Sequence, residues 1–248
     1  MIFKYAVKPK SIYKFCVSSK AIFLTMGAIF IAIAMYLGLF YVPADYQQKD
    51  AFRIIYVHVP AAFYSMGIFL SIGLLSAMFL IWRINMAEKI AYCLAPIGAT
   101  MAFVALVTGS IWGKPMWGTW WIWDARLTSE LVLFLLYCAY IGLYNSFTNL
   151  KVSQKVCAVL AVVGLIDLPI IHFSVNWWFT LHQGSTFVSM SGSKIDPSML
   201  MPFFAMMLGL LLFISGLVCS ALSCVIVQRS QGKKWVTELK SELSCKIT

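Results

Sequence analysis

Long uncharged stretches alternate with short charged segments along almost the whole chain. Each of these stretches can hold the roughly 20 apolar residues that an α-helix needs to cross a bilayer. Six of them predict membrane-spanning helices near residues 21–41, 61–81, 91–111, 129–148, 156–175 and 203–226. The pattern therefore predicts an all-α integral membrane protein, a bundle of six transmembrane helices that forms a single domain over residues 1–248.

Composition and charge support this prediction and add an orientation. The chain is 61% hydrophobic and only 11% charged, whereas about a quarter of the residues in soluble domains are charged. Basic residues in short loops stay on the cytoplasmic side, and most of the lysines and arginines lie in the N-terminal arm, the second and fourth loops and the tail near 228–248. Both termini are therefore expected in the cytoplasm, and the loops near 42–60, 112–128 and 176–202 outside.

The same charge distribution bears on the expected partners. A net charge of +10 attracts anionic lipid head groups, so we expect membrane lipids to be partners. A nucleic-acid partner is not expected, because the basic residues and the tryptophans lie on opposite sides of the membrane in this topology.

The external segment between the third and fourth spans is rich in tryptophan. Single tryptophans are common anchors at membrane interfaces, but Trp117, Trp120, Trp121 and Trp123 lie within seven positions. In a short helix on the membrane surface, the first three would share one face, with Trp123 beside them. Such an interfacial segment would offer a wide indole platform for a flat apolar ligand with a polar edge, such as a porphyrin. Asp124, which follows, is expected to be the N-cap of the fourth helix.

Two histidines flank this segment from other external loops. His58 stands two residues before Pro60, and proline favours the first position of a helix. His58 is therefore expected just ahead of a helix, whose dipole favours the neutral imidazole that binds metal. His182 lies in the loop between the fifth and sixth spans. Either histidine alone is more typical of a hydrogen-bonding loop residue, but together they predict two axial ligands of a haem iron.

Other polar and proline residues lie within the spans. Pro96, Pro169 and Pro202 are expected to bend helices rather than end them. His172 follows Pro169, and we expect it to satisfy a carbonyl that the proline frees rather than to contact iron. Asp167 is a functional candidate because acids in hydrocarbon are rare, but its role stays open. Arg126 and Glu130 are spaced to pair along the fourth helix.

The run GSIWGKPMWGTWWIWDARLTSEL (109–131) closely resembles the tryptophan-rich WWD signature of the haem-handling proteins of cytochrome c maturation. The runs ADYQQKDAFRIIYVHVPAAFYSMG (44–67) and LPIIHFSVNWWFTLHQGST (168–186) are similar to the same family. The resemblance covers most of the chain. The length and the six expected spans point to the cytochrome c maturation protein C branch rather than to larger relatives with more helices.

This resemblance implies a protein of the bacterial inner membrane that presents haem b at its periplasmic face. It implies transfer of that haem to the haem chaperone CcmE, and release of the loaded chaperone by an ATP-binding-cassette complex of CcmA and CcmB with the small subunit CcmD. It also implies that His58 and His182 ligate the iron and that a cradle holds the haem. The implied cradle residues are Trp117, Trp120, Trp121, Trp123 and Asp124.

No bond-making side chain is expected on this chain, so it is not expected to be an enzyme. Lys114, Arg126, Arg53 or Lys194 could neutralise the anionic haem propionates. Two other functions stay open. One is a b-type electron-transfer cytochrome, although its ligands would lie inside the spans. The other is a haem transporter with a pathway through the bundle, which Asp167 and the proline-containing spans suggest.

Overall fold

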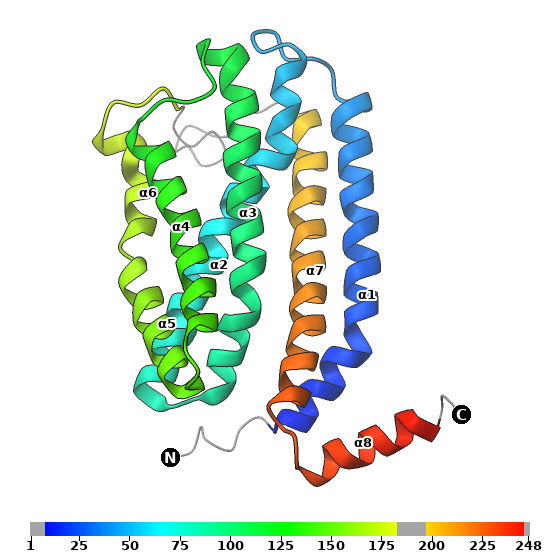
Figure 1. Cartoon of the computed structure of the whole chain (residues 1–248). Helices are drawn as coiled ribbons and strands as arrows, with labels where there is room; N and C mark the ends of the chain where they lie inside the picture. The colour runs from blue at the N-terminus through cyan, green and yellow to red at the C-terminus, as the bar shows by residue number, and fades with distance from the viewer. Residues whose placement is uncertain (1–7, 183–196, 246–248) are drawn as a thin grey trace.

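The protein is a bundle of long helices in the computed structural model, which describes residues 8–182 and 197–245 (Figure 1). Six stretches in these residues are long and apolar enough to cross a membrane, so the predicted all-α fold with six spans is confirmed and the chain is a multi-pass membrane protein. The helices are α1 (Pro9–Tyr36), η2 (Leu37–Tyr41), η3 (Asp50–Ile54), α2 (Ile55–Trp82), α3 (Asn85–Trp117), α4 (Ala125–Ser146), α5 (Leu150–Gly164), α6 (Asp167–Trp177), α7 (Pro197–Gln228) and α8 (Lys234–Cys245).

The spans form three groups that lie side by side in Figure 1. α1 packs along α7, α2 packs against α3, and α4 contacts both α5 and α6. Buried apolar side chains of α2, α4 and α6, among them Phe69, Leu133 and Ile171, form the main core. The loop between α3 and α4 lies at one end of the bundle, whereas α8 lies at the opposite end (Figure 1).

The fifth span is broken into two helices. α5 ends at Gly164 and α6 begins at Asp167. Across the junction, backbone N–H groups donate to the carbonyl three residues earlier, as Ile166 N does to Val163 O at 3.2 Å. Pro169 explains the break, because it lacks an N–H group and its ring clashes with the carbonyl four residues earlier. The expectation that Pro169 only bends this helix was wrong. Pro96 and Pro202, in contrast, lie inside α3 and α7.

A buried polar cluster joins three spans at the end of the bundle opposite the α3–α4 loop. The Nη1 group of Arg229, just after α7, donates to Glu88 Oε2 of α3 at 2.6 Å, and the Tyr144 hydroxyl of α4 donates to Glu88 Oε1 at 2.5 Å. The Arg229 Nη2 group also contacts the Tyr144 hydroxyl. We call these three residues the Glu88 cluster. Each charged group in the Glu88 cluster has a partner, as buried charges require.

Candidate functional site

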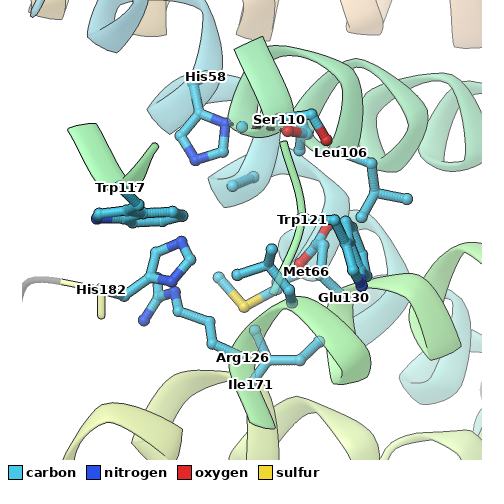
Figure 2. Close-up of a pocket in the computed structure, with 14 residues that line it drawn as sticks. His58, Met66, Leu106, Ser110, Trp117, Trp121, Arg126, Glu130, Ile171 and His182 are labelled. Atoms are coloured by element: carbon cyan, nitrogen blue, oxygen red, sulfur yellow. Dashed lines mark hydrogen bonds between the residues drawn. The ribbon is translucent and has the colours of Figure 1, made fainter. Parts of the chain in front are cut away.

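A pocket opens between α2, α3, α4 and α6 at the end of the bundle that carries the α3–α4 loop (Figure 2). It contains about 500 Å³ of empty space, its open mouth included. Both predicted histidine ligands and two of the four predicted tryptophans line it. Its principal lining residues are His58, Met66, Ser110, Trp117, Trp121, Arg126, Glu130, Ile171 and His182.

His58 enters the pocket from inside α2 rather than from the segment before it. The short helix η3 runs directly into α2, which begins at Ile55. His58 is thus the fourth residue of α2 and Pro60 the sixth, so the predicted helix start at Pro60 was wrong. The helix holds His58 more firmly than a loop would.

Hydrogen bonds from α3 fix the orientation of the His58 ring. Its Nδ1 lies 3.0 Å from the carbonyl oxygen of Ala105 and 3.2 Å from Thr108 Oγ1. Because a carbonyl can only accept, Nδ1 carries the proton and Nε2 keeps its lone pair. A Cβ added to Gly109 would lie 3.0 Å from His58 Cε1, so glycine at this position leaves room for the ring. Figure 2 shows the second ring nitrogen directed into the pocket.

His182 reaches the same pocket from the segment after α6. Its Nδ1 lies 3.5 Å from Asp124 Oδ2, and its ring centroid lies 4.8 Å from that of Trp117. Burial lowers the pKa of His182, Arg126 lowers it further, and Asp124 acts in the opposite direction. The neutral imidazole, which is the form that binds metal, is therefore favoured.

Asp124 connects the start of α4 to His182. Its Oδ1 accepts the backbone N–H of Leu127 at 2.8 Å, which confirms the predicted N-cap. Its second oxygen faces His182. One carboxylate thus caps a helix and orients an imidazole, and a partner on the far nitrogen is the usual support for a metal-binding histidine.

The tryptophan-rich segment is not a helix. α3 ends at Trp117, and Gly118 follows with a φ of +77°, a left-handed conformation that stops helices and favours glycine. Residues 118–124 are irregular up to the cap of α4. The predicted short interfacial helix was therefore wrong, because the sequence spacing does not reveal the glycine stop.

The tryptophans divide into two pairs as a result. Trp117 and Trp121 line the pocket, and the indole N–H of Trp121 is buried without a hydrogen-bond partner among the described residues. Trp120 and Trp123 are 57% and 75% exposed and are not part of the lining. A role of these two residues in a haem cradle stays a prediction.

Of the four basic residues that were candidates for propionate binding, only Arg126 lines the pocket within the described part of the chain. Arg53 is held by Asp50 Oδ1 at 2.9 Å and by the Gly38 carbonyl at 2.6 Å. Lys114 donates to the Gly118 carbonyl at 2.9 Å on the exposed surface. Lys194 lies outside the described residues.

The predicted pairing of Arg126 with Glu130 is not found. Both residues line the pocket, but the ion pairs within 4.0 Å that join described residues do not include one between them. The Arg126 guanidinium also makes no hydrogen bond to a described residue. It is therefore available to an anionic ligand.

His172 is not among the residues that line the pocket. It is exposed on α6, and its ring contacts Phe173 edge-on at 4.7 Å. The predicted hydrogen bond to a freed carbonyl is not present among the residues that the structure describes. Glu130 is the pocket residue that sequence reasoning undervalued, and its place in an apolar span was the signal that could have found it.

Fold and site together define a multi-pass helical membrane protein with a pocket of two histidines and two tryptophans at one end of the bundle. Comparison with known proteins then identifies its family. The model of the family "Heme exporter protein C" (CcmC) matches residues 1–237. The chain belongs to this family.

Individual relatives agree with the family match. "Heme exporter protein C" of Escherichia coli (strain K12) is 43% identical over 238 residues, which cover 93% of each chain. The protein of the same name from Haemophilus influenzae is 39% identical over 236 residues, 95% of this chain and 96% of its own. A "Putative cytochrome c biosynthesis ccmC-like mitochondrial protein" of Marchantia polymorpha is 46% identical over 173 residues, 70% of this chain and 73% of its own.

Proposed function

We propose that this protein presents haem b at the periplasmic face of the bacterial inner membrane and transfers it to the haem chaperone CcmE during the biogenesis of c-type cytochromes. One observation carries the proposal. His58 of α2 and His182 beyond α6 line the same pocket, and each has its Nδ1 near a protein acceptor. Both Nε2 atoms are thereby left for a metal. Membership of the heme exporter protein C family supports haem as the cargo.

The surrounding residues suit haem as a ligand. The macrocycle supplies four nitrogen ligands of its own, so two imidazoles complete the coordination of its iron. Trp117 and Trp121 offer aromatic faces and apolar area to the porphyrin. Arg126, which has no ion-pair partner among the described residues, is suited to a propionate. Trp120 and Trp123, which are largely exposed, form the outer edge of the proposed cradle and contribute less than the two lining tryptophans, and Asp124 supports the cradle through its contact with His182.

The distribution of charge supports the orientation. The end of the bundle that carries α8 also carries most of the basic loop residues, so we place it in the cytoplasm together with both termini. The pocket then faces the periplasm. We further propose that CcmA, CcmB and the small subunit CcmD form the ATP-binding-cassette complex that works with this chain.

The side chains of this protein hold and orient the haem but form no bond to its vinyl groups. His58 and His182 bind the iron on its two faces, the indoles exclude water from the ring, and the open mouth of the pocket leaves one edge accessible to the chaperone. Transfer then requires both iron–imidazole bonds to break. The chain acts as a haem-delivery protein, not as an enzyme.

The test combines haem content with haem transfer. We expect the protein purified in detergent to carry haem with the absorption spectrum of a six-coordinate, two-histidine iron. The double variant His58→Ala, His182→Ala should lose more than nine-tenths of that haem, since both ligands are removed. His172→Ala is the matched control and should keep it. Incubation with haem-free CcmE should move haem from the wild-type protein to the chaperone.

Two outcomes would contradict parts of this proposal. Unchanged haem content in the double-histidine variant would exclude these residues as ligands. Haem that stays on the protein in the presence of the chaperone, but passes electrons to a redox partner, would favour an electron-transfer cytochrome.

A further inference from the structure

The pocket contains a buried carboxyl group that holding the haem does not require. Glu130 is only 8% exposed and lines the pocket from α4. Its Oε1 accepts the hydroxyl of Ser65, a fully buried residue of α2, at 2.8 Å. No described residue donates a hydrogen bond to Oε2. Figure 2 shows Glu130 beside Trp121 and Met66, two other residues that line the pocket.

The groups around Glu130 do not neutralise it by direct contact. Arg126 stands one helical turn earlier on α4 and also lines the pocket, without an ion pair to Glu130 within 4.0 Å among the described residues. Asp167, a second buried acid, lies at the start of α6 and has one carboxylate oxygen without a partner in the described part of the chain. The Tyr137 hydroxyl donates to the Ser65 carbonyl instead, at 2.6 Å.

The remaining pocket groups complete this electrostatic setting. α2 contributes His58, the segment after α6 contributes His182, and α3 contributes the hydroxyl of Ser110. Once both imidazoles bind iron, they no longer take up protons. The iron of a haem bound in this pocket would then be a charge beside Glu130 that changes when the iron is reduced or oxidised. In a site of low dielectric constant, a carboxyl group responds strongly to such a change.

We propose that Glu130 takes up a proton when the iron is reduced and releases it when the iron is oxidised. This inference rests on the proposed haem site. When a one-electron donor reduces Fe(III) to Fe(II), the site loses one positive charge. The Glu130 carboxylate then takes up one proton from solvent and becomes a neutral carboxylic acid. Oxidation returns the electron to an acceptor and the proton to solvent. Glu130 keeps the net charge of the pocket constant and favours the ferric state at high pH.

The test is a spectroelectrochemical titration of the haem-loaded protein at several pH values. One pH unit changes the proton concentration tenfold, which corresponds to about 59 mV for one electron. We expect the wild-type midpoint potential to fall with rising pH, with a slope that approaches this value. Glu130→Gln, which cannot ionise, should remove most of the slope and raise the potential at high pH. The haem propionates are common to both proteins, so the difference between the slopes reports Glu130.

Two further variants keep the test decisive. Asp50→Asn removes an acid whose side chain is 77% exposed outside the pocket, and it should keep the wild-type slope. Ser65→Ala removes the donor to Glu130 Oε1, which makes the carboxylate less stable, so the region of steep pH dependence should move to higher pH. This variant decides the question if Glu130→Gln does not fold.

The outcomes separate this inference from the function on which it rests. Equal slopes in wild type and Glu130→Gln, with the two-histidine spectrum intact, would overturn the role of Glu130 alone. An unmoved pH region in Ser65→Ala would do the same. A wild-type protein without the two-histidine spectrum would overturn the haem site and this inference together.

Discussion

The two ends of the bundle both bury charged side chains, but they treat them differently. In the Glu88 cluster, both carboxylate oxygens of Glu88 accept hydrogen bonds, and Arg229 donates to Glu88 and contacts Tyr144. In the pocket, the indole N–H of Trp121 is buried without a hydrogen-bond partner among the described residues, and no ion pair between described residues joins Arg126 to Glu130. Unpaired buried polar groups cost free energy. The difference therefore separates an end whose polar groups are satisfied by the protein itself from an end that, under the proposed function, is completed by a ligand.

The two ends should therefore differ in what their buried polar groups contribute, stability in the Glu88 cluster and ligand binding in the pocket. The Glu88 cluster ties together α3, α4 and the end of α7, and a buried pair of this kind is strongly destabilising to break. The pocket groups contact their surroundings less fully, so their removal should affect binding more than folding. A substitution in the Glu88 cluster should lower stability more than the matched substitution in the pocket. The substitution in the pocket should lower haem affinity more.

The largest expected effect comes from one isosteric substitution made at each end. Glu88→Gln leaves the Arg229 charge buried beside a neutral amide, so the free energy of unfolding should fall by about 3 kcal/mol. Glu130→Gln should lower it by less than about 1 kcal/mol, because the amide oxygen can still accept from Ser65. Unfolding in detergent by increasing SDS, followed by far-ultraviolet circular dichroism, measures both values. Similar losses at the two ends would remove the proposed distinction.

Arg126→Gln should have the next largest effect, on binding rather than on folding. It removes the charge-assisted hydrogen bond that we propose to a propionate, worth about 1.5 to 3 kcal/mol, and should weaken haem affinity at least about tenfold. Lys114→Gln, which removes an exposed charge near the same end, is the control and should bind haem as the wild type does. Titration of haem-free protein with haem gives both affinities. Equal weakening in the two variants would indicate a general effect of positive charge.

The bundle could be predicted from the sequence because its signal is local. Six apolar stretches of sufficient length are enough to predict six spans, and an aspartate before a periodic stretch is enough to predict the cap at Asp124. The ends of the helices were less predictable. α2 starts at Ile55 because η3 leads into it, and the break at Asp167 depends on how Pro169 meets the preceding turn.

The convergence of His58 and His182 was predicted from their external loops, and both line the pocket, but partnerships between distant residues without such a motif could not be predicted. Arg229 and Glu88 lie 141 positions apart, and nothing in the spacing of one sequence joins them. The tryptophans illustrate a second limit, because Gly118 stops α3 and sends Trp120 and Trp123 outward. A helical spacing rule applied across that glycine gave the wrong conformation for the segment.

A smaller effect should separate the two classes of tryptophan. Trp121→Phe removes a buried N–H and part of the pocket wall, so it should weaken haem affinity by about 1 kcal/mol, roughly fivefold. Trp123→Phe changes a largely exposed ring and should leave the affinity within about twofold, a difference below 0.5 kcal/mol. Haem titration of the two variants compares them directly. Equal weakening would support the platform of four tryptophans that the sequence predicts.

The smallest effect compares two helix caps, one at each end of the bundle. Asp124 caps α4 beside the pocket, and Asn149 caps α5 at the opposite end by accepting the N–H of Lys151 at 3.0 Å. Substitution of either cap by alanine should cost about 1 kcal/mol of stability. Only Asp124→Ala should also accelerate haem loss to a haem scavenger, because only Asp124 contacts His182.

Asp124→Asn separates the two roles of this residue. Asparagine caps helices about as well as aspartate, so the stability of this variant should stay within about 0.5 kcal/mol of the wild type. It lacks the negative charge that faces His182, and its haem should therefore dissociate faster even though α4 is intact. Wild-type dissociation in Asp124→Asn, together with fast dissociation in Asp124→Ala, would instead mean that the cap alone positions His182.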